Sequence, residues 1–203
     1  MNIDQCKKNH LSMNCGELNL IIGPMFSGKT SFLLSKLTRY VDVGINSLYI
    51  NSHLDTRSTD FSTHNSSLNQ ISSKILTVKV ENLSQVNQKL IDDVQVIAVD
   101  ESQFFSDLLT VIPHWMKLGK ILFVAGLDGD YNQSTFGSIL SLIPICSSVK
   151  KLLSVCELCK KDCIITSAPF TIRSKSSNEL ILIGGKDVYL PVCFSHLQLY
   201  KEI

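Results

Sequence analysis

The chain carries the octet Gly23-Pro24-Met25-Phe26-Ser27-Gly28-Lys29-Thr30 between an apolar run and an amphipathic stretch. The apolar run, residues 18–22, has the composition of a buried strand, and residues 31–40 have the apolar spacing of a helix. The octet matches G-x-x-x-x-G-K-[ST] in the strand–loop–helix context that makes this pattern specific. We therefore expect a phosphate-binding loop at the start of a parallel α/β domain.

The residue types of the octet suit a nucleoside triphosphate. Gly23 and Gly28 let the backbone curl with its N–H groups turned inward, and the following helix directs the positive end of its dipole to the same point. Lys29 supplies a mobile charge for the outer phosphates, and the hydroxyl of Thr30 can hold Mg²⁺. We expect all eight residues of the octet to contact ATP. A chance glycine-rich turn is the alternative, which the flanking patterns disfavour.

Composition limits the remaining function classes. A chain of 203 residues fits one domain, or one domain with a small appendage. The 19 basic and 18 acidic residues give a net charge of +1, and only three basic residues are arginines, so no basic stripe for nucleic acid is expected. The chain shows no signal peptide and no apolar run long enough to span a membrane. Its seven cysteines without a secretory context favour a reduced compartment, so we expect a cytoplasmic protein without membrane or nucleic-acid partners.

Apolar strands alternate with helical patterns along the chain, which predicts a parallel sheet flanked by helices. The expected strands are residues 18–22, 47–51, 75–80, 94–99, 121–125 and 149–153. The expected helices are residues 31–40, 83–91 and 105–118, the last of them kinked or broken at Pro113. The polar stretch 52–74 is expected to be either disordered or an active-site loop.

Two carboxylates follow the most apolar of these strands. Asp100 and Glu101 come directly after Val-Ile-Ala-Val, about 70 residues after Lys29. In phosphate-loop proteins the first such acid reaches Mg²⁺, often through water, and a second acid can accept a proton from the attacking group. Two acids at a strand end are common by themselves, but this position relative to the phosphate loop makes the pair a candidate catalytic site.

A second group of residues has the spacing of a structural zinc site. Cys156-x-x-Cys159 and Cys193-x-x-His196 are each spaced as a half-site, and together they offer four N/S ligands. Cys163 is an alternative ligand, and the four residues can also be unrelated thiols and a surface histidine. We prefer His196 because it pairs symmetrically with Cys193.

Taken together, these motifs resemble the type II thymidine kinases, a cytosolic and viral deoxynucleoside kinase family. The matching motifs, in order, are the octet, Asp55-Thr56-Arg57, residues 99–105 (VDESQFF), residues 125–131 (AGLDGDY), and the segment from Cys-x-x-Cys to Gly184-Gly185-x-x-x-Tyr189-x-x-x-Cys193. The resemblance implies a P-loop (RecA-like) sheet with a small C-terminal zinc-binding lasso domain. The expected division is residues 1–16 as a flexible extension, 17–152 as the kinase core and 153–203 as the zinc-binding and lasso domain.

The resemblance also implies a reaction, the ATP-dependent phosphorylation of thymidine, and of deoxyuridine, at the 5′-hydroxyl in pyrimidine deoxynucleotide salvage. Glu101 is then the base for that hydroxyl, while Lys29 and Arg57 steady the transferring charge. The implied cofactors are Mg²⁺ and structural zinc, and the implied assembly is a homotetramer. The Mg²⁺ residues are Thr30, Asp55 and Asp100.

The resemblance places the nucleoside between apolar walls and a loop that closes over it. The wall residues are Met25, Phe104, Leu127 and Tyr131, and the loop residues are Thr166, Leu182, Ile183 and Tyr189. In this interpretation the zinc site, Cys156, Cys159, Cys193 and His196, anchors both ends of the loop, which excludes water from the pocket.

The chain departs from the family pattern at several positions near the substrate. Ser167 and Ala168 stand where a basic residue is frequent after Thr166, Asn65 stands where an acid is usual, and Asp130-Tyr131 replaces Thr-Phe. These differences bear on substrate range. The alternative functions are a zinc-bearing P-loop ATPase that acts on nucleic acid, which the near-zero net charge disfavours, and an inactive binding scaffold, which the intact acid pair disfavours.

Overall fold

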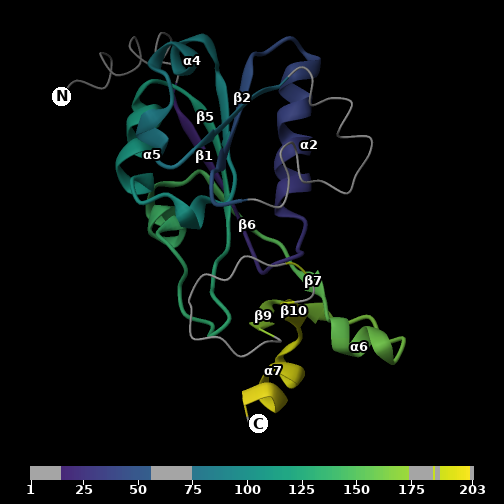
Figure 1. The fold of residues 1–203 in the computed structure, drawn as a ribbon. Helices are drawn as coiled ribbons and strands as arrows, with labels where there is room; N and C mark the ends of the chain where they lie inside the picture. Colours follow the sequence, from purple (N-terminus) through teal and green to yellow (C-terminus); the bar gives the residue numbers. More distant parts are fainter. Residues whose placement is uncertain (1–14, 56–74, 174–184, 186–187, 202–203) are drawn as a thin grey trace, which may run out of the picture.

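The computed structural model describes residues 15–55, 75–173, 185 and 188–201. It shows a layered α/β core and a smaller strand-rich unit that lies beyond one end of the sheet (Figure 1). Within the described residues, no helix has the length and apolar character needed to cross a membrane.

The core is built on six parallel strands in the order β3-β2-β4-β5-β1-β6. The predicted parallel sheet is therefore confirmed, and the strand before the two acids lies near its middle, buried at every position. Because all strands run the same way, the segments after β1, β2, β4 and β5 meet at one edge. The strands are β1 (Glu17–Ile22), β2 (Ser47–Ser52), β3 (Leu76–Val80), β4 (Val96–Val99), β5 (Ile121–Gly126) and β6 (Ser148–Lys151).

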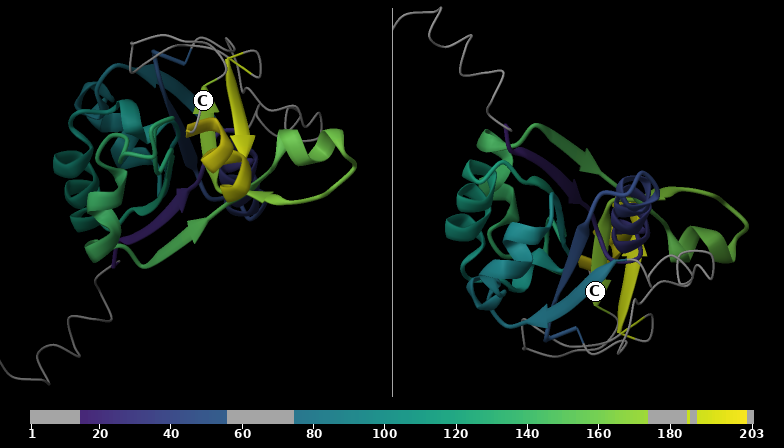
Figure 2. Two further views of the ribbon diagram at one scale, coloured as in Figure 1. Left: turned by 90° about the horizontal axis from the view of Figure 1, so that it is seen from below. Right: turned by 90° about the horizontal axis from the view of Figure 1, so that it is seen from above.

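Helices cover both faces of the sheet. The long helix α2 (Lys29–Asp42) packs on one face through Leu33, Leu34 and Leu37. The other face is covered by α5 (Leu108–Lys117), α4 (Gln88–Asp93) and short 3₁₀ turns, with the two helical layers on opposite sides in Figure 2. The 3₁₀ turns are η2 (Leu83–Gln85), η3 (Ser102–Phe104) and η4 (Ile139–Ile145). This three-layer arrangement fixes the edge at which the site forms.

Two helix predictions need correction, namely a break at Pro113 and a single helix at residues 83–91. Pro113 lies inside α5 without ending the helix, because Ile112 and Trp115 are both buried against the core and hold the turns around it in place. The expected single helix at residues 83–91 is divided into η2 and α4, because Val86 is extended and Asn87 begins a new helix by accepting a hydrogen bond from the Lys89 N–H. Tertiary burial overrides local propensity in the first case, and side-chain capping redirects the chain in the second.

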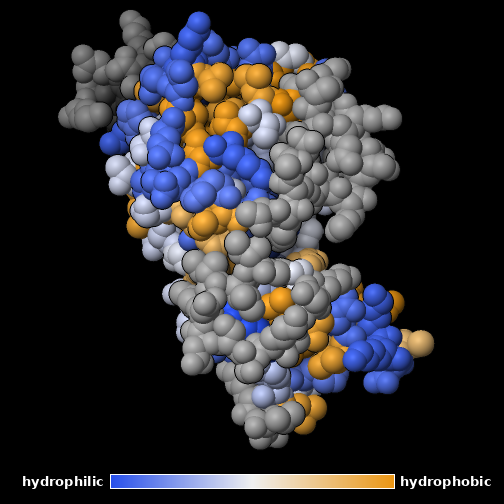
Figure 3. Space-filling model, in the orientation of Figure 1, coloured by the Kyte–Doolittle hydropathy of each residue, from blue (hydrophilic) through white to orange (hydrophobic). Residues whose placement is uncertain are grey.

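The C-terminal unit has a small core of its own. Its strands form two antiparallel pairs, β7 with β8 and β9 with β10. The described elements are β7 (Ser154–Val155), α6 (Glu157–Lys161), β8 (Ser167–Ala168), β9 (Phe170–Arg173), β10 (Tyr189–Val192) and α7 (Phe194–Lys201). Hydrophilic residues gather at the surface around α6, where Lys160 and Lys161 are exposed (Figure 3). Since Ile172, Val192 and Leu197 pack together apart from the sheet, we propose that the two units divide at residues 152–153.

Candidate active site

The phosphate loop leaves β1 and enters α2 through two glycines that no other residue can replace easily. Gly28 has φ 82° at the start of α2, a left-handed conformation that L side chains rarely adopt. Gly23 has φ 150°, and a Cβ atom there would lie 2.3 Å from the carbonyl oxygen of Leu152. Both glycines of the octet are therefore required by the backbone itself.

The ammonium group of Lys29 lies inside the phosphate loop. Its Nζ donates hydrogen bonds to the carbonyl oxygens of Gly23 at 3.2 Å and Pro24 at 2.7 Å, and the residue is buried. The cation is thus held at the point toward which the helix directs its positive end. Together they make this loop a concentrated positive site suited to an anion such as a triphosphate.

The first acid, Asp100, is buried and accepts three hydrogen bonds. Its Oδ2 accepts from the hydroxyl of Thr30 at 2.6 Å and from that of Tyr49 at 2.8 Å, while its Oδ1 accepts from the Glu101 N–H at 2.9 Å. Burial, followed by the charge of Glu101, raises the pKa of Asp100 to about 6, although these hydrogen bonds oppose the shift. The carboxylate is therefore destabilised in the absence of a cation.

Oxygen donors at this edge fit a magnesium ion. The Thr30 hydroxyl donates its hydrogen to Asp100, so the lone pairs of its oxygen remain available to a cation. Two acids, Asp100 and Glu101, follow β4 directly. Asp55 is buried after β2, where the amide of Asn51 donates to its carboxylate at 3.0 Å. Arg57, which the sequence also assigned to the site, lies outside the described residues.

The second acid, Glu101, has an unusual backbone. Its φ of 49° is left-handed, a conformation that non-glycine residues hold only where the surroundings enforce it. Gln103 supplies one constraint, since its side-chain N–H donates to the Glu101 carboxylate at 2.5 Å and its oxygen accepts from the Leu127 N–H at 3.0 Å. A Cβ at Gly126 would lie 2.9 Å from that oxygen. Gln103 therefore joins the acid to the loop after β5.

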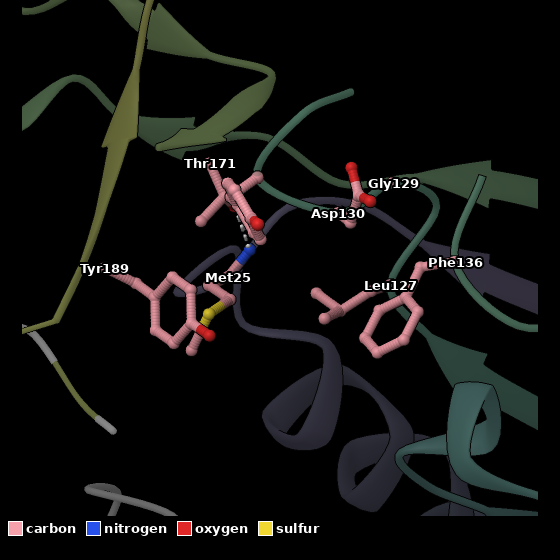
Figure 4. Close-up of a pocket in the computed structure, with 8 residues that line it drawn as sticks. Met25, Leu127, Gly129, Asp130, Phe136, Thr171 and Tyr189 are labelled. Carbon is pink, nitrogen blue, oxygen red and sulfur yellow. Dashed lines mark hydrogen bonds between the residues drawn. The ribbon is translucent and has the colours of Figure 1, made fainter. Parts of the chain in front are cut away.

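A pocket opens beside the loop that follows β5 (Figure 4). Four of the predicted nucleoside residues, Met25, Leu127, Tyr131 and Tyr189, line it. The other lining residues are Gly129, Asp130, Phe136 and Thr171. Figure 4 places the methionine and Tyr189 opposite Leu127 and Phe136, so that apolar surfaces face each other across the pocket. Such a slot suits a flat, partly apolar ring.

Two other residues predicted for the pocket do not line it, and two more lie outside the described residues. Phe104 is not among the lining residues, but its ring packs edge-on against that of Phe136 at 5.8 Å between centroids. Thr166 lies beside the cysteines, where its carbonyl oxygen accepts a hydrogen bond from the Cys156 N–H at 2.9 Å. Leu182 and Ile183 lie outside the described residues.

The two Cys/His pairs come together in the C-terminal unit. The ring Nδ1 of His196 lies 3.4, 3.5 and 3.3 Å from the sulfurs of Cys156, Cys159 and Cys193, and the last two sulfurs are 3.8 Å apart. A tetrahedral zinc site with Zn–S of about 2.3 Å and Zn–N of about 2.0–2.1 Å has edges of roughly 3.5–3.8 Å. Cys163 is exposed and outside this group. The four side chains are thus close enough together to hold a zinc ion.

Backbone N–H groups stabilise the thiolate form of one of these cysteines. Burial alone would raise the pKa of the Cys156 thiol, but N–H groups of Cys159, Cys193 and Leu158 outweigh it and lower the pKa to about 6. The thiolate is the form that binds metal ions. The cluster therefore offers at least one anionic sulfur near neutral pH.

Comparison with known proteins agrees with this geometry. Residues 16–197 match the family model described as thymidine kinase. The chain belongs to the thymidine kinase family. It is 38% identical to the thymidine kinase of Amsacta moorei entomopoxvirus, over 87% of this chain and 94% of the relative, and 34% identical to that of myxoma virus strain Uriarra, over 90% and 97%. It is also 40% identical to a rice thymidine kinase, over 89% of this chain and 66% of the relative.

Among solved structures, flagellar accessory protein FlaH from Methanocaldococcus jannaschii superposes with a TM-score of 0.47 and 15% identity, over 68% of this chain and 71% of that one. This likeness is too distant to add to the family assignment.

In this member of the thymidine kinase family, sequence reasoning missed several residues at the pocket. Thr171 lines it, and Arg173 lies buried next to it, with its guanidinium 3.9 Å from the Tyr131 ring centroid and a hydrogen bond of 2.8 Å to the Tyr189 hydroxyl. Thr171 is followed two positions later by a basic residue, which is the pattern expected after Thr166. That spacing was the signal that could have identified Thr171.

Proposed function

We propose that this chain transfers the γ-phosphate of ATP to the 5′-hydroxyl of thymidine, and of deoxyuridine. The observation that carries the proposal is the link through Gln103, which bonds to Glu101 on one side and to Leu127 of the pocket on the other. A nucleoside whose base occupies the pocket has its sugar toward the acid pair and the phosphate loop. Membership of the thymidine kinase family supports this substrate.

In the proposed reaction Glu101 accepts the proton of the 5′-hydroxyl as that oxygen attacks the γ-phosphorus in line. A base held in position contributes about 10²–10⁴-fold to the rate. Lys29 neutralises charge on the transferring group, and Arg57 is proposed to do the same. Mg²⁺, when bound, would supply positive charge that offsets the charge developing on the phosphate oxygens. Thr30 and Asp100 would hold it, with Asp55 acting directly or through water.

For the nucleoside, we propose that Met25, Leu127, Tyr131 and Tyr189 enclose the base. Thr171 takes the role first expected of Thr166, since it lines the pocket and is bonded to the phosphate loop. Phe104 supports the wall through Phe136. Leu182 and Ile183 remain proposed contacts of the closing loop.

The remaining proposals concern the metal site, the location and the assembly of the protein. We propose that Cys156, Cys159, Cys193 and His196 bind structural zinc, which fixes the C-terminal unit on which Thr171 and Tyr189 are carried. We also propose that the protein is cytoplasmic, assembles as a homotetramer and has no nucleic-acid partner, and the family assignment and the composition support this proposal.

The acceptor atom can be tested with 5′-deoxythymidine, which keeps the base and lacks only the reacting hydroxyl. We expect it to compete with thymidine for binding and to receive no phosphate, whereas 3′-deoxythymidine is phosphorylated. Phosphate transfer to 5′-deoxythymidine would contradict the proposed acceptor.

A further inference from the structure

Tyr49 is a buried residue that lies at the acid pair but belongs to none of the motifs considered so far. It is in β2, pairs in register with Ala98 of β4, and is 2% exposed. Its ring packs in the cluster beneath α2 with Leu33 and Leu37. Its hydroxyl emerges from that cluster and donates a hydrogen bond of 2.8 Å to Oδ2 of Asp100.

The hydroxyl of Tyr49 shares this acceptor oxygen with that of Thr30. Thr30 reaches Oδ2 from the start of α2 at 2.6 Å, and Tyr49 reaches it from β2. Because the two donors come from different elements, they fix the plane of the Asp100 carboxylate as well as its position. At neutral pH a tyrosine hydroxyl carries its proton, so it is the donor in this hydrogen bond to the carboxylate.

We propose that Tyr49 is a positioning residue for phosphoryl transfer, which orients Asp100 and Thr30 toward the magnesium ion of Mg·ATP. This inference rests on the proposed function. In this role Tyr49 acts through its hydrogen bond to Asp100. Hydrogen-bond partners of this kind set the orientation of metal-binding groups, and their loss typically weakens metal affinity about 10–100-fold.

Tyr49→Phe tests the inference because it removes only the hydroxyl and keeps the ring in its cluster. Titration calorimetry would measure ATP binding at a series of Mg²⁺ concentrations, and also without metal. We expect the Mg²⁺ concentration for half-maximal enhancement of binding to rise roughly tenfold, with metal-free ATP binding unchanged. The Mg²⁺ concentration for half-maximal kinase activity should rise in parallel.

Tyr40→Phe is the matched control. Tyr40 packs against the same cluster, on Phe123 at 5.9 Å between ring centroids. The hydroxyls that donate to Asp100 are instead those of Thr30 and Tyr49. A shift in Tyr49→Phe no larger than that in Tyr40→Phe would overturn the inference. Thermal melting of both variants measures any general loss of stability.

A double-variant comparison separates positioning from a structural effect. In an Asp100→Asn background, Tyr49→Phe should cause no further change in the Mg²⁺ dependence of ATP binding, because the carboxylate through which Tyr49 acts is already absent. An undiminished effect in that background would overturn the inference. Failure of the proposed function is distinguishable, since it appears as wild-type protein that binds Mg·ATP without phosphorylating thymidine.

Discussion

The backbone N–H of Met25 donates a hydrogen bond of 3.0 Å to the hydroxyl of Thr171, 146 residues further along the chain. It ties the phosphate loop of the core to strand β9 of the C-terminal unit. Both residues also line the pocket. One contact therefore couples the phosphate loop to the wall of the proposed nucleoside site.

Replacing Thr171 by valine should weaken thymidine binding. The substitution keeps the shape of the side chain and leaves the partly buried Met25 N–H without its acceptor, which costs about 1–2 kcal/mol, toward the lower end of the range for buried groups. We expect the KM for thymidine to rise about tenfold, since each 1.4 kcal/mol corresponds to about a factor of ten. Thr171→Ser keeps the hydroxyl and should stay within about threefold of wild type. Equal effects of the two variants would remove the hydrogen bond from the account.

Replacing Glu101 by glutamine should lower kcat and leave ATP binding intact. The carboxylate is the proposed base, and its loss should cost about 10²–10⁴-fold in kcat. Nucleotide affinity should change little, because the phosphate loop supplies the triphosphate contacts. Steady-state kinetics and calorimetry measure the two quantities separately. Turnover close to that of wild type would exclude Glu101 as the base.

Replacing Cys156 by serine should release the metal and loosen the C-terminal unit before the sheet. We expect a substoichiometric zinc content by elemental analysis. Amide hydrogen exchange should be faster than in wild type in β9 and β10, while the core strands remain protected. Cys163→Ser is the control, because Cys163 is exposed and lies outside the cluster. Full zinc content in Cys156→Ser, or equal loss in the control, would contradict the ligand assignment.

Replacing Asp100 by asparagine should stabilise the metal-free protein at neutral pH. The pKa of Asp100 is raised from 3.8 to about 6, so the folded state binds its proton more tightly than the unfolded state. Its contribution to the free energy of unfolding therefore falls as the pH rises from about 4 to about 6, by up to about 3 kcal/mol for a shift of about two units. The Asp100→Asn variant has no titrating carboxyl at this position, so its free energy of unfolding does not fall in this way.

Urea unfolding of Asp100→Asn and wild type at several pH values, without magnesium or nucleotide, measures the effect. The advantage of the variant should grow between pH 4 and 6 and then stay constant. A difference that does not depend on pH would show that Asp100 does not titrate as described.

The parts of this protein that could be predicted from sequence depend on local patterns. The glycines of the phosphate loop, the apolar strand before Asp100 and the paired spacing of Cys193 and His196 each carry their meaning within a few residues. The remaining features depend on contacts between distant segments. Tyr49 reads as an ordinary strand residue until β4 brings Asp100 beside it. Thr171 and Thr166 differ in role only because the chain folds one toward the phosphate loop and the other toward the cysteines.

Transfer of label from γ-labelled Mg·ATP tests the central claim most directly. Wild-type protein would be incubated with thymidine, with deoxycytidine or with no nucleoside, and the products separated. The account predicts thymidine-dependent label in thymidine 5′-monophosphate and almost no free phosphate without nucleoside. Release of inorganic phosphate at the same rate in all three mixtures would contradict it and would favour an ATPase.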